Sequence, residues 1–409
     1  MRAELGARLE PRATDRPTSV LGAGNDDLDA GRRYLQALAG SGLAVPLWPR
    51  EYGGLGATPE QIGIVRGELA AFAVPDLYPY LVGLELVGPT LLAHGTPEQC
   101  ARWLPKIASG DAIWCQLFSE PGAGSDLAGL STRAEGGGGE WIVNGQKVWT
   151  SRGAYARFGL LLARTDPSVP KHRGITAFGI DLVTSGVDVR PLRQMNGDAH
   201  FTEVFLDDAG VPDADRIGGV GEGWRVALTC LSYERGAGSV GGGGLLDVER
   251  LIAIARARGL ANDPLVRDAL ARVIVEARVL GYTARRARDT ARAGRPGPEG
   301  SGMKLRGSKL FRDYTSVAAR ILGPEITIEP HGEMQTILLT APSLSIRGGT
   351  DEIQRNIVGE RVLGLPEEPR VDRELPFDQL LRSNDSYTAR TRASLRGSPE
   401  GSNRRSFIT

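Results

Sequence analysis

The stretch from Trp114 to Ser151 constrains the fold of this chain of 409 residues more than any other. It starts with an apolar run and enters a turn rich in Pro and Gly at residues 121–125, where glycine lets a backbone approach a ligand closely. Two short alternating segments follow, joined by Asn144-Gly145, a pair typical of a β-hairpin. The stretch predicts a β-rich unit that offers backbone amides and small hydroxyls to a flat, polar ligand beside the Trp149 indole.

Helical patterns flank this unit on both sides. Apolar residues recur at helical spacing from Asp27 to Gly110, and Thr96-Pro97-Glu98-Gln99 has the form of a capping box with Pro at the first helical position. Helical periodicity returns after Gly221 and is clearest between Asp263 and Arg286. We therefore expect an α+β chain with an N-terminal helical bundle (27–110), a central antiparallel β-barrel or sandwich (111–215) and a C-terminal four-helix bundle (216–369).

The two ends of the chain differ in composition from these three parts. Residues 1–26 are rich in Pro, Gly and charge, which predicts a mobile N-terminal arm. Residues 370–409 are polar and rich in Ser and Arg, which predicts a disordered or loosely docked tail.

Composition narrows the classes of partner. Lys and Arg total 49, as do Asp and Glu, so nothing in the charge favours nucleic acid or an anionic membrane as a partner. The three cysteines, Cys100, Cys115 and Cys230, lie far apart without metal-ligand spacing, which predicts buried thiols and no metal site. No apolar run is long enough to span a bilayer, and we expect a soluble cytoplasmic protein that binds a small molecule or another subunit.

The opening stretch as a whole resembles the flavin-binding signature of the acyl-CoA dehydrogenase family. Two further segments resemble that family in matching order, GEGWRVALTCLSYERG at 221–236 and IRGGTDEIQRNIVGERVLGLP at 346–366. The resemblance implies an FAD enzyme that removes the α-proton and the β-hydride of an acyl-CoA thioester and leaves a trans-2-enoyl product. It also implies a homotetramer or homodimer that passes electrons to an electron-transfer flavoprotein.

The catalytic base is where the chain departs from part of that family. Many members carry the catalytic Glu just before the Gly-Thr of the C-terminal motif, and here that position is Gly348. Isovaleryl-CoA and long-chain types place it at the position that matches Glu234, so we expect Glu234 to be the base with Arg235 as its local charge partner. Burial between a flavin and an acyl chain would raise the pKa of that carboxyl toward the working range of a general base. The residues alone favour a structural pair of Glu234 and Arg235, and the absence of any other Glu or Asp at the matching positions reverses that preference.

The resemblance also implies the ligand contacts. Residues from Gln116 to Ser125 wrap the isoalloxazine and the start of the diphosphate, and Ser151 touches the reactive flavin nitrogen. The helix start after Gly349 receives phosphates on free N–H groups. The cofactor contacts are Gln116, Leu117, Phe118, Ser119, Gly124, Ser125, Trp149, Thr150, Ser151, Thr350, Asp351 and Glu352. The substrate contacts are Ser125, Tyr233, Glu234, Arg235, Gly348 and Gly349, with a backbone N–H near Gly348 polarising the thioester carbonyl.

In the family a neighbouring subunit grips the adenine half of the cofactor. The matching positions are Arg256, Arg267, Arg320 and Gly323. The match departs from the family at Gly259, where an aromatic is usual, and at Pro324, where a second glycine is usual.

Two alternatives to the dehydrogenase stay open, and two of the motif segments have other readings. One is a same-fold oxidase or flavin monooxygenase acting on a CoA-bound or carrier-bound substrate. Another is a non-catalytic or half-site subunit of a hetero-oligomer, favoured by Gly348, Gly259 and Pro324. On residues alone, Trp149 also reads as a core indole, and residues 350–352 read as a capped surface helix. Separately, the glycines of 236–244 predict room for a bulky or branched acyl group.

Overall fold

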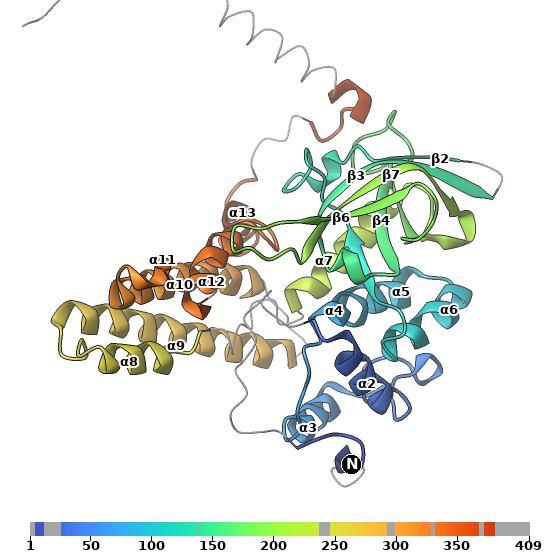
Figure 1. Cartoon of the computed structure of the whole chain (residues 1–409). Coiled ribbons are helices and arrows are strands. Elements are labelled where there is room, and N and C mark those ends of the chain that lie inside the picture. Colours follow the sequence, from blue (N-terminus) through green and yellow to red (C-terminus); the bar gives the residue numbers. More distant parts are fainter. Residues whose placement is uncertain are drawn as a thin grey trace, which may run out of the picture.

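The computed structural model describes residues 5–11, 26–136, 139–236, 246–292, 299–328, 332–367 and 372–380. Within them the order helices, sheet, helices agrees with the expected α+β class (Figure 1). The helices that precede the sheet are α2 (Leu28–Ala39), η1 (Arg50–Tyr52), α3 (Pro59–Leu69), α4 (Tyr78–Leu81), η2 (Val82–Val87), α5 (Gly88–His94) and α6 (Pro97–Ala108).

Capping residues and close packing fix the positions of the N-terminal helices. Thr58 and Thr96 each cap a helix with a complete capping box and Pro in the first turn, which confirms the box predicted at Thr96. Gly88 lies so close to the Trp48 ring that a Cβ would sit 2.1 Å from it, so α5 can pack there only without a side chain. These helices bury an apolar core that continues into the first strands of the sheet.

The middle of the chain forms one eight-stranded sheet in the order β6-β7-β3-β2-β4-β5-β8, with β1 paired to β4. Most pairs are antiparallel as expected, but β1 and β2 each meet β4 in parallel, so the sheet is mixed. Its strands are β1 (Trp114–Leu117), β2 (Arg133–Gly136), β3 (Glu140–Ser151), β4 (Phe158–Arg164), β5 (Ile175–Asp181), β6 (Val187–Leu192), β7 (Phe201–Pro212) and β8 (Arg216–Ile217), with short helical turns η3 (Leu127–Gly129), η4 (Gly153–Tyr155) and η5 (Asp213–Asp215) between them.

The hairpin predicted at Asn144-Gly145 does not form. β3 continues through these residues, because β7 pairs with the residues before them and with the residues after them. The register of this pairing shifts between Val143 and Gly145, as in a β-bulge. A Cβ on Gly145 would lie 2.4 Å from Thr132 Oγ1, so the glycine permits a close approach of β2 and is not a turn residue.

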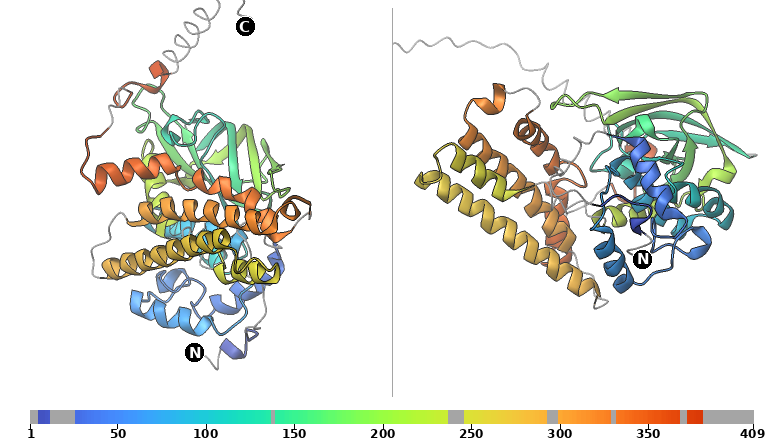
Figure 2. Two further views of the ribbon diagram at one scale, coloured as in Figure 1. Left: turned by 90° about the vertical axis from the view of Figure 1, so that its left-hand side faces the viewer. Right: turned by 60° about the horizontal axis from the view of Figure 1, so that its bottom comes forward.

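Of the helices that follow the sheet, α7 (Gly223–Gly236) packs with the sheet and the N-terminal helices, and the later ones form the second helical layer (Figures 1 and 2). The long helices α9 and α10 lie side by side, and their buried faces share a core that includes Leu251, Val273 and Tyr314. These helices are α7 (Gly223–Gly236), α8 (Val248–Ala257), α9 (Pro264–Arg292), α10 (Glu299–Leu322), α11 (Glu325–Ile328), α12 (Glu333–Thr340), η6 (Ala341–Ser345) and α13 (Asp351–Arg361).

Parts of both chain ends are docked. In the expected mobile arm, Leu5 and Leu9 are buried, and Glu10 O accepts a hydrogen bond from Ala73 N at 2.8 Å. In the expected tail, residues 372–380 lie against the sheet domain, with Phe377 buried. The predictions for residues 1–4, 12–25, 370–371 and 381–409 fall outside the described residues.

A buried ion pair joins β3 to the turn after β1. Lys147, fully buried, donates to Phe118 O at 3.2 Å and to Glu120 Oε1 at 2.7 Å. Glu120 also accepts the backbone N–H groups of Ser131 at 2.6 Å and Thr132 at 2.9 Å. Burial lowers the pKa of Lys147 to about 8. Burial would raise the pKa of Glu120, but Lys147 and the donated hydrogen bonds outweigh it and lower the value, so the pair stays charged at neutral pH.

Removing one partner should destabilise the whole sheet domain. Lys147→Met leaves the Glu120 carboxylate buried and uncompensated, which should lower the free energy of unfolding by about 3–5 kcal/mol. The measurement is denaturant unfolding of the variant, with Lys309→Met on the exposed face of α10 as control, since its pair with Asp313 is largely solvated. Equal stability of the two variants would contradict this role.

Candidate functional site

The site begins where α7 meets the loop before α13. A Cβ built on Gly348 would lie 3.6 Å from Glu234 Oε1, so these two positions share one point in space. Gly348 and Gly349 have φ of +65° and +80°, the left-handed region that a residue with a side chain adopts only with strain. The structure therefore brings together the two positions at which the resemblance puts a base, and only one of them carries a carboxylate.

The loop beside Glu234 is held by its own hydrogen bonds. Gln354 donates to Gly348 O at 3.2 Å, and Thr350 caps α13 by accepting from Ile353 N at 3.2 Å. A Cβ on Gly349 would lie 2.6 Å from the Gln354 amide nitrogen, so a side chain here would displace that amide as well as strain the backbone at φ of +80°. The loop thus presents its backbone to Glu234 in one fixed shape.

The helix that carries Glu234 also touches the first strand. Gln116 on β1 donates to the Cys230 sulfur at 3.6 Å, one helical turn before Glu234, and Tyr233 packs on the same core. Burial, with a further contribution from the Glu234 carboxylate, raises the pKa of Cys230 to about 12. Cys230 is therefore an inert neighbour of the site, and Glu234 lies one helical turn from a contact with Gln116, where the segment expected to wrap the isoalloxazine begins.

Trp149 is a second part of the candidate site, beside the turn that follows β1. Its side chain is 58 % exposed although large and apolar, and its φ of +60° is rare for such a residue. Val148 N donates to Ser119 O at 2.9 Å, so the end of β3 lies beside the turn after β1. The alternative reading of Trp149 as a core indole is wrong.

The residues around Trp149 fit a flat cofactor with polar edges. Cβ atoms on Gly122 and Gly124 would meet nothing within 4 Å, and Ser125 beside them is exposed. Thr150 is buried and its Oγ1 has no hydrogen-bond partner among the described residues. An exposed indole, an open glycine turn and an orphaned hydroxyl together match what FAD requires, and Ser151 is half-buried beside them.

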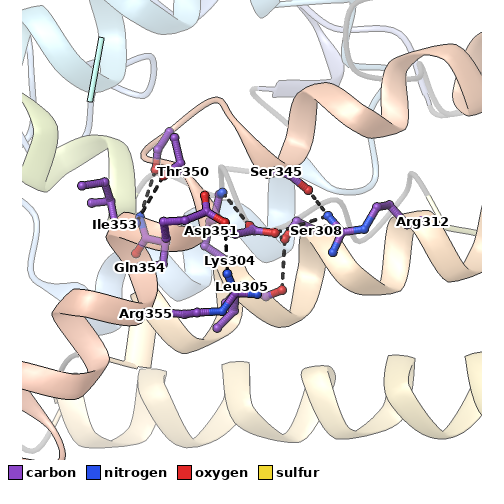
Figure 3. Close-up of polar contacts among 12 residues, drawn as sticks. Lys304, Leu305, Ser308, Arg312, Ser345, Thr350, Asp351, Ile353, Gln354 and Arg355 are labelled. Atoms are coloured by element: carbon purple, nitrogen blue, oxygen red, sulfur yellow. Dashed lines mark hydrogen bonds and ion pairs between the residues drawn. The ribbon is translucent and has the colours of Figure 1, made fainter. Parts of the chain in front are cut away.

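The start of α13 differs from the expectation in one respect (Figure 3). The Asp351 carboxylate is buried and accepts from Ser308 at 2.7 Å and Lys304 at 3.1 Å, and it lies 3.3 Å from Arg312. This side chain thus ties α13 to α10, and only the backbone of the helix start remains available for phosphates. Glu352 is exposed and pairs with Arg355 at 3.1 Å.

The expected adenine contacts lie on the C-terminal bundle, on α8, α9 and the end of α10. These helices lie away from the sheet in Figure 1. Arg267 donates to Ala261 O at 3.3 Å, and Gly323 has φ of +61° at the end of α10. Contact of Arg256, Arg267, Arg320 and Gly323 with a cofactor in a neighbouring subunit stays a prediction.

Two arginines near the site were not singled out from the sequence. Arg152, buried directly after Ser151, lies 2.9 Å from Asp26, and its guanidinium lies 4.9 Å from the centre of the Tyr78 ring. Arg347 directly precedes Gly348, and burial lowers the pKa of its guanidinium, an effect that the nearby Tyr78 phenol partly offsets. The sequence signal that could have indicated these two arginines is their position, since Arg152 follows Ser151 and Arg347 precedes Gly348.

Some expected site features lie outside the described part of the chain. The Arg235 side chain and the glycines from 237 to 244 belong to this group. In the described residues, the three cysteines are free and buried, as expected, and no group of His, Cys, Asp and Glu side chains is arranged to hold a metal ion. None of the described helices has the length and apolar character needed to cross a membrane.

Three family models match the chain in order. They describe the acyl-CoA dehydrogenase N-terminal domain at residues 21–111, the middle domain at 115–209 and the C-terminal domain at 221–363. A solved structure named Tcur3481-Tcur3483 steroid ACAD has a TM-score of 0.75 and 29% identity, covering 85% of this chain and 91% of its own.

Two curated relatives come from Mycobacterium tuberculosis. Acyl-CoA dehydrogenase FadE34 is 42% identical over 81% of this chain, which spans only 46% of that relative's length. Acyl-CoA dehydrogenase IpdE1 is 39% identical over 83% of this chain and 89% of its own length. Acyl-CoA dehydrogenases are oxidoreductases, and the three matching domains together show that this chain belongs to the acyl-CoA dehydrogenase family.

Proposed function

We propose that this chain catalyses the α,β-dehydrogenation of an acyl-CoA thioester with bound FAD, and that Glu234 is the base. The observation that carries the proposal is the 3.6 Å between Glu234 Oε1 and the Cβ position of Gly348. The family places its base at one of these two chain positions, and both converge here. A carboxylate at this point serves the same reaction whichever element supplies it.

The chain's own residues would do most of the work. Glu234 takes the α-proton on a carboxylate oxygen, while the fixed Gly348-Gly349 backbone orients the thioester beside it. The exposed Trp149 ring and the turn at 121–125 hold the cofactor against β3. FAD, when bound, accepts the hydride from the β-carbon, and an electron-transfer flavoprotein is the proposed next acceptor.

The space at Gly348 supports a bulky acyl group over a short straight one. Gly348 is exposed, and among the described residues only the Glu234 oxygen lies within 4 Å of its Cβ position. The similarity to a steroid ACAD supports the same direction. We therefore propose a branched or polycyclic acyl thioester as substrate.

A second candidate is that the chain works as one member of an unlike pair. The steroid ACAD named above carries a paired name, and FadE34 is about twice the length that this chain matches. Gly259 and Pro324 also depart from the family at the adenine contacts. In this case this chain would supply Glu234, and the unlike subunit would supply the contacts with the adenine half of the cofactor.

Replacing the base should separate cofactor binding from chemistry. Glu234→Gln keeps the shape but cannot take a proton, so the protein should stay yellow while substrate-dependent bleaching slows by about 10²–10⁴-fold. Stopped-flow absorbance measures the rate, with Glu135→Gln on the exposed edge of β2 as control. Bleaching at the wild-type rate would mean that another group is the base.

Gly348→Ala should obstruct the site without removing the base. The methyl group would contact Glu234 Oε1 at 3.6 Å and fill space needed by the substrate, so bleaching should slow most with bulky acyl groups. Gly364→Ala is a matched control, because Gly364 has the same φ of +65° and open space around it. Both variants should lose about 1 kcal/mol of stability, measured by thermal unfolding. Identical substrate preference in the two variants would contradict the role of Gly348.

Expression alone and with a partner tests the paired arrangement. If the chain is one member of an unlike pair, it should hold little FAD alone and recover it when co-expressed with a second family chain from the same organism. Flavin absorbance per mole of purified protein measures this. A full complement of FAD in the chain alone would establish the like-subunit form, and rapid reoxidation of the reduced protein in air would favour an oxidase.

A further inference from the structure

After α13 the chain returns to the sheet domain as a short segment, Asp372–Leu380, which we call the strap. In Figure 1 it is the dark red piece beside the sheet. Pro376 forms a bridge with Pro170, and Phe377 N donates to Val169 O at 3.0 Å. The Phe377 side chain is 5 % exposed, so the strap is docked by both backbone and side chain.

The first link from the strap runs through Lys171. This side chain is nearly buried, and its ammonium lies 2.5 Å from Asp372 and 2.9 Å from Asp126. Burial would lower the pKa of Lys171, but hydrogen bonds to the two carboxylates outweigh it and raise the value. Asp126 directly follows Ser125 in the open turn, so an ammonium ion joins the strap to that turn.

The second link runs through Arg164. Its guanidinium donates to Ala128 O at 2.6 Å and Leu130 O at 3.1 Å, which lie a few residues after the open turn. The Phe377 ring covers the guanidinium, with 3.5 Å from Cζ to the ring centre. A cation enclosed in this way gains a stabilising contact with the aromatic face and is shielded from water.

These links add to the support that the loop has from the core. At its start, Glu120 is fixed by Lys147 and bridges to the buried Ala123, whereas Cβ positions on Gly122 and Gly124 would meet nothing within 4 Å. Lys171 and Arg164 fix the other end, and both are held in turn by the strap. Residues 121–130 are thus anchored from both sides, and one of the anchors comes from the C-terminal end of the chain.

We propose that the strap positions the ligand loop 121–130 through Lys171 and Arg164, so that the affinity for the cofactor depends on residues 372–380. The identity of the ligand rests on the proposed function, but the mechanical link does not. Asp372 and Phe377 are positioning residues in this arrangement, since neither lies in the loop.

The test uses the full chain with Asp372→Asn, Phe377→Ala and the control Glu374→Gln, which removes a charge from an exposed strap residue. Amide hydrogen exchange of peptides covering 121–130 should be about tenfold faster in the first two variants and unchanged in the control. The Kd for FAD, measured by flavin fluorescence, should rise about threefold in Asp372→Asn and about tenfold in Phe377→Ala. Exchange in α9 and α10 should not change, which separates positioning from general loss of stability.

Two results would overturn the proposal. One is loop exchange in Asp372→Asn and Phe377→Ala equal to that of Glu374→Gln. The other is faster loop exchange with an unaltered Kd for FAD. A wild-type chain that binds no FAD either alone or co-expressed with a second family chain would refute the proposed function, and the exchange measurement would still decide whether the strap holds the loop. If Phe377→Ala does not fold, Asp372→Asn alone decides, because its side chain is 40 % exposed and its loss leaves the strap backbone intact.

Discussion

The buried pair of Lys147 and Glu120 is the contact on which the rest of the site depends. It joins the middle of β3 to the turn after β1, and Glu120 passes the connection on to the backbone of Ser131 and Thr132. A buried charge is tolerated only when it is paired and hydrogen-bonded, and both partners meet that condition. Because Trp149 follows Lys147 by two residues, the same pair sets where the exposed indole stands relative to the open turn.

Local chemistry was readable from the sequence and distant pairing was not. The capping box at Thr96 depends on four consecutive residues, so its prediction was confirmed. Asn144-Gly145 failed as a hairpin because its conformation is decided by β7, which lies far along the chain. The parallel entry of β1 and the Lys147–Glu120 pair were missed for the same reason, since nothing in the adjacent residues indicates the partner.

The candidate site was predictable mainly through the family motifs. Glu234 and Gly348 came from two motifs, and only the structure shows how closely they approach. Asp351 shows that the role of a motif residue in the family does not always fit the structure. A carboxylate at a helix start is read as part of a phosphate site, but here its side chain is enclosed by Ser308 and Lys304. The strap was predicted only as a polar tail, because its docking depends on Lys171 and Arg164, which belong to another domain.

The base position that we propose would account for a glycine at 348, where many members of the family carry an acid. The proposed reaction requires a carboxylate at one point in space, and the Glu234 side chain of α7 reaches to 3.6 Å from the Cβ position of Gly348. A helix holds Glu234 on regular backbone, whereas a side chain at Gly348 would have to accept φ of +65°. With the acid on α7, the loop carries no side chain in the left-handed conformation, and the Cβ position of Gly348 stays empty. Under the proposed function, the placement of the base and the size of the acyl group would therefore be coupled.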